Sequence, residues 1–194
     1  MASLVLAGDT SGSITVSAPA VSGSNTQTLA AVTGTLAPVV SGTAVASTSG
    51  TSIDFTGIPS WVKRITVMLN GVSTNGTSIM QIQLGAGSVD TTSTYLGYAV
   101  VATNTLGTGG TGFTTGFLLN NAQVATDLWY GNVVFTNITG NTWTVTSCLA
   151  NPNNTRNAFI GGSKALSGTL DRVRITTVNG TDTFDAGTIN ILYE

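Results

Sequence analysis

The sequence has very little charge and no histidine. Lys, Arg, Asp and Glu make up 7% of its 194 residues, against about 25% in an average soluble domain. Without histidine, Ser-His-Asp catalysis, Cys-His catalysis and imidazole metal sites are excluded. Because Cys148 is the only cysteine, an internal disulfide and a cysteine-ligated zinc or iron–sulfur site are excluded too. No cofactor and no metal site are expected.

Two further absences concern nucleic acid and membranes. The net charge of −2 and the isoelectric point near 4.7 argue against a surface that neutralises phosphates. No apolar run approaches the roughly 18 residues of a membrane-spanning helix. The first nine residues also lack the basic start and the longer apolar run of a signal peptide. We therefore expect neither nucleic-acid binding nor membrane insertion.

Uncharged polar residues and glycine take the place of the missing charge. The chain contains 35 Thr, 24 Gly, 18 Ser and 15 Asn. Threonine favours strands, whereas glycine and asparagine favour turns. No window of helical length carries a sustained 3.6-residue apolar stripe with caps. The composition and pattern predict an all-β chain.

From residue 51 onward the apolar residues alternate as they do in half-buried strands. Ile65, Val67 and Leu69 share one face of a strand that Asn70–Gly71 is expected to end. Residues 80–84 place three apolar side chains inward and Gln81 and Gln83 outward. Further strands are expected at residues 95–101, 113–119, 128–138, 142–149, 158–160, 169–178 and 188–193. Their spacing predicts a jelly-roll-like antiparallel β-sandwich over residues 51–194.

The first 50 residues have a different composition. They contain one charged residue, Asp9, and no aromatic residue, and Pro19 and Pro38 interrupt any regular strand. Such a segment cannot bury enough large apolar side chains to fold alone. We therefore predict an extended N-terminal arm over residues 1–50, serving as an anchor or shaft and ordered by oligomerisation.

Three patterns resemble parts of active sites, but each is more typical of a turn. Residues 9–12 (DTSG) lack the spacing and the second copy of an aspartic-protease element. Residues 107–112 (GTGGTG) satisfy a dinucleotide-binding spacing, but the residues that follow have poor helix propensity. Asp171, Asp182 and Asp185 could in principle supply a glycosidase pair, yet Asp182 and Asp185 stand in turn contexts. We predict that the chain is not an enzyme.

The aromatic residues provide the candidates for sugar recognition, because aromatic faces stack on sugars while asparagine binds hydroxyls. The candidate contacts to a surface glycan are Trp129, Tyr130, Asn153 and Asn154, and Trp61 and Trp143 have the same capacity. The loops expected to carry such contacts are residues 70–77, 103–112, 120–127 and 151–157. The alternative is that the tryptophans build the core or a subunit interface, since only 13 aromatic residues serve the whole chain.

Three segments resemble structural proteins of tailed bacteriophages. Residues 12–20 (GSITVSAPA), continuing to 25–29 (NTQTL), resemble a linker of such proteins. Residues 53–67 (IDFTGIPSWVKRITV) resemble the opening of a C-terminal module in tail-fibre and related virion proteins, and residues 184–194 (FDAGTINILYE) resemble its end. The resemblance implies a virion protein of the tail-fibre or head-fibre type, and it implies no catalytic residues.

The resemblance and the composition lead to the same functional expectation. We expect a fibre or appendage protein of a virion assembled in the bacterial cytoplasm, anchored by residues 1–50 to other virion proteins. A homotrimer would order the arm, and three copies of a weak carbohydrate site would add avidity for host attachment. The alternatives are a capsid decoration or cement protein without receptor binding and, as a third hypothesis, a depolymerase acting on surface polysaccharide.

Overall fold

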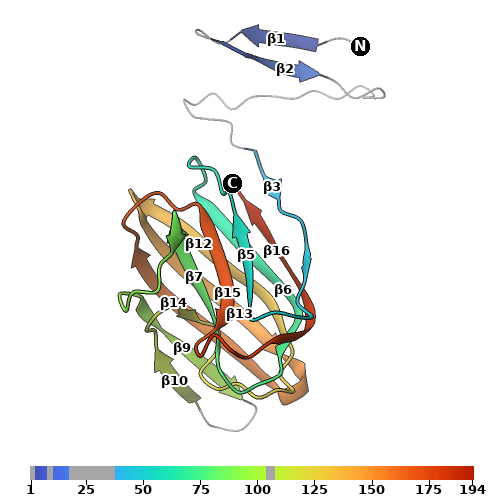
Figure 1. Cartoon of the computed structure of the whole chain (residues 1–194), viewed down its shortest axis with the longest axis vertical. Coiled ribbons are helices and arrows are strands. Elements are labelled where there is room, and N and C mark those ends of the chain that lie inside the picture. Colours follow the sequence, from blue (N-terminus) through green and yellow to red (C-terminus); the bar gives the residue numbers. More distant parts are fainter. Residues whose placement is uncertain (1–2, 8–10, 18–37, 104–107) are drawn as a thin grey trace. The chain divides into compact units, whose positions relative to one another are not determined.

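The computed structural model describes residues 3–7, 11–17, 38–103 and 108–194, whose regular secondary structure is almost entirely β-strand (Figure 1). The one helical element among them is a 3-10 turn, η1 (Pro152–Asn154). The predicted all-β class and antiparallel sandwich are confirmed. The chain divides into two compact units, Met1–Leu36 and Ala37–Glu194.

In the first unit, β1 (Ser3–Ala7) and β2 (Ser13–Ser17) form an antiparallel hairpin. Val5 lies opposite Thr15, and the side chains of Val5, Leu6 and Val16 are all more than half exposed. The hairpin is joined by backbone pairing and leaves these three apolar side chains largely exposed. Residues 18–37 of the predicted arm lie outside the described residues.

The larger sheet of the second unit has the strand order β10-β9-β14-β13-β12-β6-β16-β3, and β4 also pairs with β16. All of these pairings are antiparallel. In chain order the strands are β3 (Val40–Ser41), β4 (Val45–Ala46), β6 (Arg64–Thr74), β9 (Leu96–Thr103), β10 (Thr108–Gly112), β12 (Trp129–Thr139), β13 (Thr142–Asn151), β14 (Arg156–Ala165) and β16 (Phe184–Tyr193).

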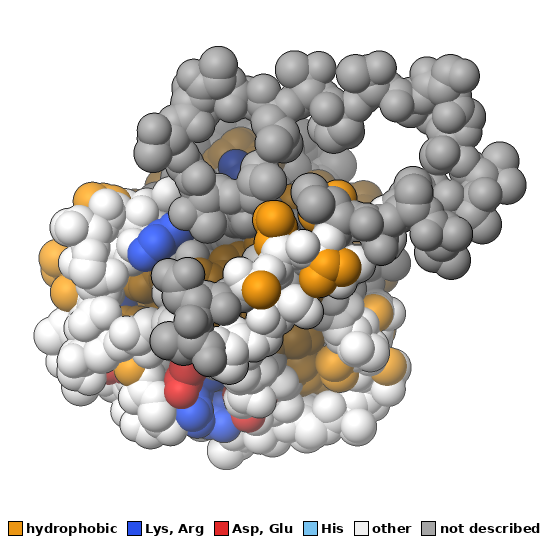
Figure 2. Space-filling model, turned by 90° about the horizontal axis from the view of Figure 1, so that it is seen from above, with side chains coloured by type: hydrophobic (Ala, Val, Ile, Leu, Met, Phe, Trp, Pro, Cys, Tyr) orange, Lys and Arg blue, Asp and Glu red, His pale blue; other side chains and the backbone are white. Residues whose placement is uncertain are grey.

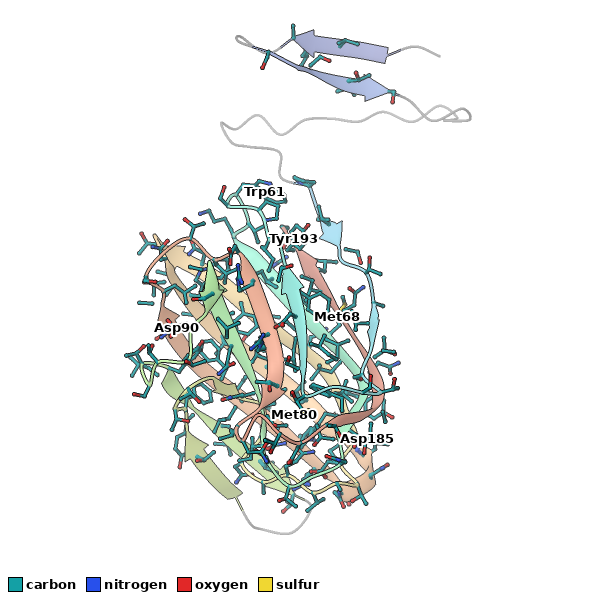
Figure 3. All side chains as sticks on the ribbon, in the orientation of Figure 1. Trp61, Met68, Met80, Asp90, Asp185 and Tyr193 are labelled. Carbon is teal, nitrogen blue, oxygen red and sulfur yellow. The ribbon has the colours of Figure 1, made fainter. Side chains whose placement is uncertain are left out.

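The smaller sheet has the order β11-β7-β15-β5, with β8 paired to β7. Its strands are β5 (Ser52–Thr56), β7 (Met80–Ala86), β8 (Ser88–Val89), β11 (Phe117–Leu118) and β15 (Arg172–Thr177). The core lies between the two sheets, where Phe117 of β11 contacts Phe135 of β12 with ring centroids 5.5 Å apart. Met80 lies in this interior layer (Figure 3).

Alternation within the strands produces this core. Ile65, Val67 and Leu69 of β6 are buried, as the period-2 pattern predicts. Met80, Ile82 and Leu84 of β7 are likewise fully buried and face the larger sheet. Burial of apolar side chains contributes roughly 25 cal/mol per Å², so these two faces supply much of the stability of the sandwich.

The expected turn at Asn70–Gly71 is instead a bulge inside β6. The strand continues to Thr74, and the register with β12 shifts so that Asn70 and Gly71 together oppose Tyr130. Gly71 has φ +66°, a conformation that glycine adopts without strain. By contrast, Asn179–Gly180 forms the predicted turn, with Gly180 N donating to Thr177 O at 3.1 Å.

The boundary expected between residues 50 and 51 lies inside the second unit. Both β3 and β4 pair with β16, in the registers Val40–Tyr193 and Val45–Ile189. Ser47 is fully buried, and its hydroxyl donates to Ala186 O at 2.8 Å. Residues 40–47 are therefore ordered by their own sandwich through backbone bonds, which a composition of small side chains does not reveal.

Candidate functional site

Four loops meet at one end of the sandwich, which we call the loop end: residues 75–79, 119–128, 152–155 and 178–183. The strand registers place them there, because Trp129 pairs with Val72, and Arg156 pairs with both Asn151 and Thr103. Two of the predicted recognition loops, 120–127 and 151–157, lie at this end together with the last part of 70–77. Residues 104–107 of the remaining one lie outside the described residues.

The strand β3 begins at the opposite end, where Val40 pairs with Tyr193. Trp61 lies at that end as well, with its ring centroid 6.0 Å from that of Tyr193 (Figure 3). The Trp61 side chain is 41% exposed, whereas that of Trp143 is buried. Of the three tryptophans, Trp61 alone has an accessible face.

The prediction of Trp129 as a glycan contact is wrong, because the side chain is fully buried. Its position at the start of β12 gives it the same orientation as Val133 and Phe135, which face the core. That parity is the sequence signal that could have placed it inside. The indole Nε1 donates to Gln123 Oε1 at 3.0 Å, and Asn120 Nδ2 donates to the same oxygen at 2.7 Å.

The other three predicted contacts reach the surface, but the two asparagine amides are already engaged. Tyr130 is half-buried on the outer face of β12 and lies against Gly71. Asn153 and Asn154 are exposed in η1. Asn153 Nδ2 donates to Thr126 O at 3.3 Å, and Asn154 Nδ2 donates to Asp127. These two amides hold the 119–128 loop.

Asp127 organises the loop end. Its Oδ1 accepts hydrogen bonds from Asn151 Nδ2 and Asn154 Nδ2, each at 2.6 Å, and from the Arg156 guanidinium. Its Oδ2 accepts the backbone N–H of Val124 at 3.0 Å. The Asp127 side chain is fully buried, so these donors replace its hydration. We call these four side chains the Asp127 cluster: Asp127, Asn151, Asn154 and Arg156.

A second charged group occupies the opposite end of β14. Lys164 is 1% exposed and forms an ion pair with Asp90 at 2.9 Å. Its ammonium also donates to the Thr92 hydroxyl at 2.9 Å and to that of Thr94, and lies 4.5 Å from the Tyr95 ring centroid. We call these five residues the Lys164 cluster. It borders an open pocket of about 520 Å³ lined by residues of the 86–94 and 164–167 segments.

The surroundings of the Lys164 cluster shift two pKa values. Burial opposes ionisation of Asp90, but hydrogen bonds from Thr92 and Lys164 outweigh it and lower the pKa of that carboxyl. Burial raises the pKa of Tyr95, and the nearby Asp90 charge adds to the increase. The three donors of the Lys164 ammonium meet three oxygen acceptors, so the cluster is complete without a ligand.

The outer face of the smaller sheet carries a site that the sequence pattern did not reveal. Gln81 and Gln83 point outward from β7 as predicted, yet they are only 2% and 5% exposed. They lie in a groove of about 320 Å³ beside Thr115, Arg174 and Thr176. A strand pattern shows which face a residue occupies, but it does not show that a loop covers that face.

Most of the basic residues of the chain are paired with carboxylates. Five of the six Lys and Arg residues form ion pairs, namely Arg64–Glu194, Arg156–Asp127, Lys164–Asp90, Arg172–Asp171 and Arg174–Asp54. The Arg172 guanidinium lowers the pKa of Asp171, and hydrogen bonding to Asp54 raises the pKa of Arg174. Asp182 accepts Ser78 N at 2.9 Å and Asn179 Nδ2 at 2.7 Å. These contacts tie Asp171 to a cation and Asp182 to amides of two turns.

Among the residues that the structure describes, no group of three potential ligands could hold a metal ion. In the same part of the chain, no helix has the length and apolarity to cross a membrane. No family model matches this chain, and no curated protein or solved structure is significantly similar to it.

Proposed function

We propose that this chain is a structural component of a bacteriophage virion, a fibre or appendage protein anchored through its N-terminal residues. It assembles as a homotrimer, joins other virion proteins through the N-terminal unit, and exposes the β-sandwich to the carbohydrate of the host surface. The resemblance of residues 12–20, 53–67 and 184–194 to virion proteins supports the assignment to a virion. The composition supports a structural role without catalysis.

The observation that carries this proposal is the internal use of charge. Five cations bond to five carboxylates of the same chain, and two of these pairs pin loops at the two ends of β14. The remaining described surface is largely uncharged, as one view of it shows (Figure 2). A surface of this kind suits assembly and weak multivalent contact more than acid–base catalysis.

The alternative, a capsid decoration protein, is favoured by one surface patch. Leu96 and Tyr98 of β9 and Phe159 of β14 are 68%, 53% and 44% exposed. They lie on the outer face of the larger sheet, where Gly161 opposite Tyr98 adds no side chain. Apolar groups on an uncharged sheet face are suited to lateral contact with other subunits.

The oligomeric mass of the full chain tests the fibre proposal. Light scattering should give a trimer for the full chain and a folded monomer for residues 37–194. A third form, residues 51–194, should be less stable than 37–194, because it lacks β3, β4 and the Ser47 bonds. A monomeric full chain would contradict the proposal, and imaging of particles with the chain spread over the capsid lattice would favour the alternative.

A further inference from the structure

The groove on the outer face of the smaller sheet is built on two cross-strand rows. One row runs from Asp54 through Arg174 to Gln83, and the next from Ser52 through Thr176 to Gln81. These residues alternate with the inward-facing core residues of β5, β15 and β7. The floor of the groove is therefore rigid, because the strands that carry it are held by the core beneath.

Segments from outside the sheet form the walls of the groove. Thr115 lies beside β7, where its carbonyl accepts Gln83 Nε2 at 2.8 Å. The turn after β15, including Asn179 and Gly180, closes one side, and Thr91 also lines the groove. These walls account for the burial of two amides on a sheet face that would otherwise be open to solvent.

Most donor groups of the groove floor already make a bond within the protein. Gln81 Nε2 donates to Thr177 O at 3.4 Å, and the Thr176 hydroxyl donates to Thr51 O at 2.8 Å. The Arg174 guanidinium makes two bonds to the Asp54 carboxylate, at 2.7 and 2.8 Å. The groove therefore has no free cation with which to bind an anion.

An acceptor remains unused. Gln81 Oε1 is buried and has no hydrogen-bond partner among the described residues. Leaving a buried polar group unpaired is destabilising, so a fold that needed only an outer sheet face would be better served by an apolar residue. The terminal torsion of glutamine is soft. A rotation that turns this oxygen toward a ligand hydroxyl gives up only the long 3.4 Å bond from Gln81 Nε2 to Thr177 O.

We propose that this groove binds a neutral saccharide, whose hydroxyl groups donate to Gln81 and to the threonine oxygens around it. The chemistry selects a neutral polyhydroxylated ligand, because the charges cancel within the groove and because saccharide hydroxyls can both donate to its oxygens and accept from its remaining N–H and O–H groups. This inference rests on the adhesive part of the proposed function and places recognition on the smaller sheet, away from Trp129 and its neighbours.

The test is a titration of the ¹⁵N-labelled full chain with three trisaccharides. Maltotriose and triacetylchitotriose are the neutral probes, and trigalacturonate is the anionic one. At least one neutral probe should shift the amide signals of Gln81, Gln83 and Thr176 saturably, with an affinity at least tenfold above that of trigalacturonate. No saturable shift with either neutral probe would overturn the proposal.

Two variants on one strand separate the groove from the rest of the surface. Ser52→Trp fills the groove and should weaken binding at least tenfold. Thr56→Trp lies on the same outer face of β5 but does not line the groove, so its affinity should stay within twofold of the parent. Equal affinities of the two variants would overturn the proposal, and their NMR dispersion checks that both are folded.

A third variant tests the unused acceptor. Gln81→Met keeps the shape of the side chain and removes the amide, so binding should fall about tenfold while the melting temperature stays the same or rises. Unchanged binding would overturn the role of Gln81.

If the saccharide instead shifts the signals of Asn153 and Asn154, the groove is rejected as the binding site and the proposed adhesive function is retained. If no probe binds but the full chain is a trimer, the groove is rejected as a binding site and the proposed structural role of the chain is retained.

Discussion

At each end of β14 an inward-pointing cation is neutralised by a carboxylate, but the two clusters are arranged in opposite ways. Arg156 and Lys164 both point inward from this strand, and each cation meets a carboxylate and an aromatic ring. In the Asp127 cluster the centre is the carboxylate, and its partner Asn151 is buried. In the Lys164 cluster the centre is the ammonium, and its partners Thr92 and Thr94 are exposed.

This difference decides what each cluster loses when its centre is removed. Around Asp127, Asn151 is buried and the Arg156 side chain is only 13% exposed, so little water can reach these two donors to replace the lost acceptor. Around Lys164 the acceptors can turn to solvent. The cost of removing a buried charge thus depends on the exposure of the groups that it leaves behind, more than on the number of its bonds.

The largest effect is expected from Asp127→Ala. This change removes the acceptor of four donors and leaves the Arg156 guanidinium, which is 13% exposed, without its carboxylate. The free energy of unfolding should fall by about 3–5 kcal/mol, measured by denaturant titration, and the 119–128 loop should become sensitive to protease. The exposed residue Asp185 at the same end provides the control variant Asp185→Ala. A loss below about 1 kcal/mol would show that the Asp127 cluster is not required.

Removal of the two charged members of the Lys164 cluster should have unequal effects on stability. Asp90→Ala leaves a buried ammonium with only hydroxyl partners and should cost about 2–3 kcal/mol, whereas Lys164→Met leaves solvent-accessible partners and should cost about 1 kcal/mol or less. The same denaturant titrations compare the two. If Lys164→Met were the more damaging change, the exposure argument would fail.

The smallest effect is a pH dependence from Asp90. Its pKa is lowered in the folded state, so its contribution is fully present above the unfolded value near 3.9 and is lost as pH falls through the folded pKa. The difference in melting temperature between the parent and Asp90→Asn should therefore be constant above about pH 5 and shrink below about pH 4. Asp185→Asn is the matched control. A difference that grows on acidification would contradict the sign of the shift.

The alternation of apolar and polar residues predicted which residues build the core, but it did not predict which surface residues can contact a ligand. The orientation of Ile65, Val67, Leu69 and of the residues around Gln81 followed from the two-residue period of a strand. The same parity applied to Trp129 and to Arg156 indicates inward positions, which an interpretation based on residue type overlooked. A glycan role assigned from side-chain chemistry alone therefore failed at Trp129.

Turn signals were only partly predictable. Asn179–Gly180 forms a turn, because the strand pairing ends there, whereas the same pair of residue types at 70–71 forms a bulge between two partner strands. Both need a glycine with positive φ, so the local sequence cannot distinguish them. The outcome depends on whether neighbouring strands continue beyond the glycine.

The sequence by itself determined the all-β class, the absence of histidine and thiol-cluster chemistry, and the inward faces of residues 65–69 and 80–84. These properties follow from composition and from a local period. Only the tertiary structure decided the strand order, the inclusion of residues 40–47 in the sandwich, the burial of Gln81 and Gln83, and the partners of each charge. Those features depend on contacts between residues far apart in the chain, which no local pattern encodes.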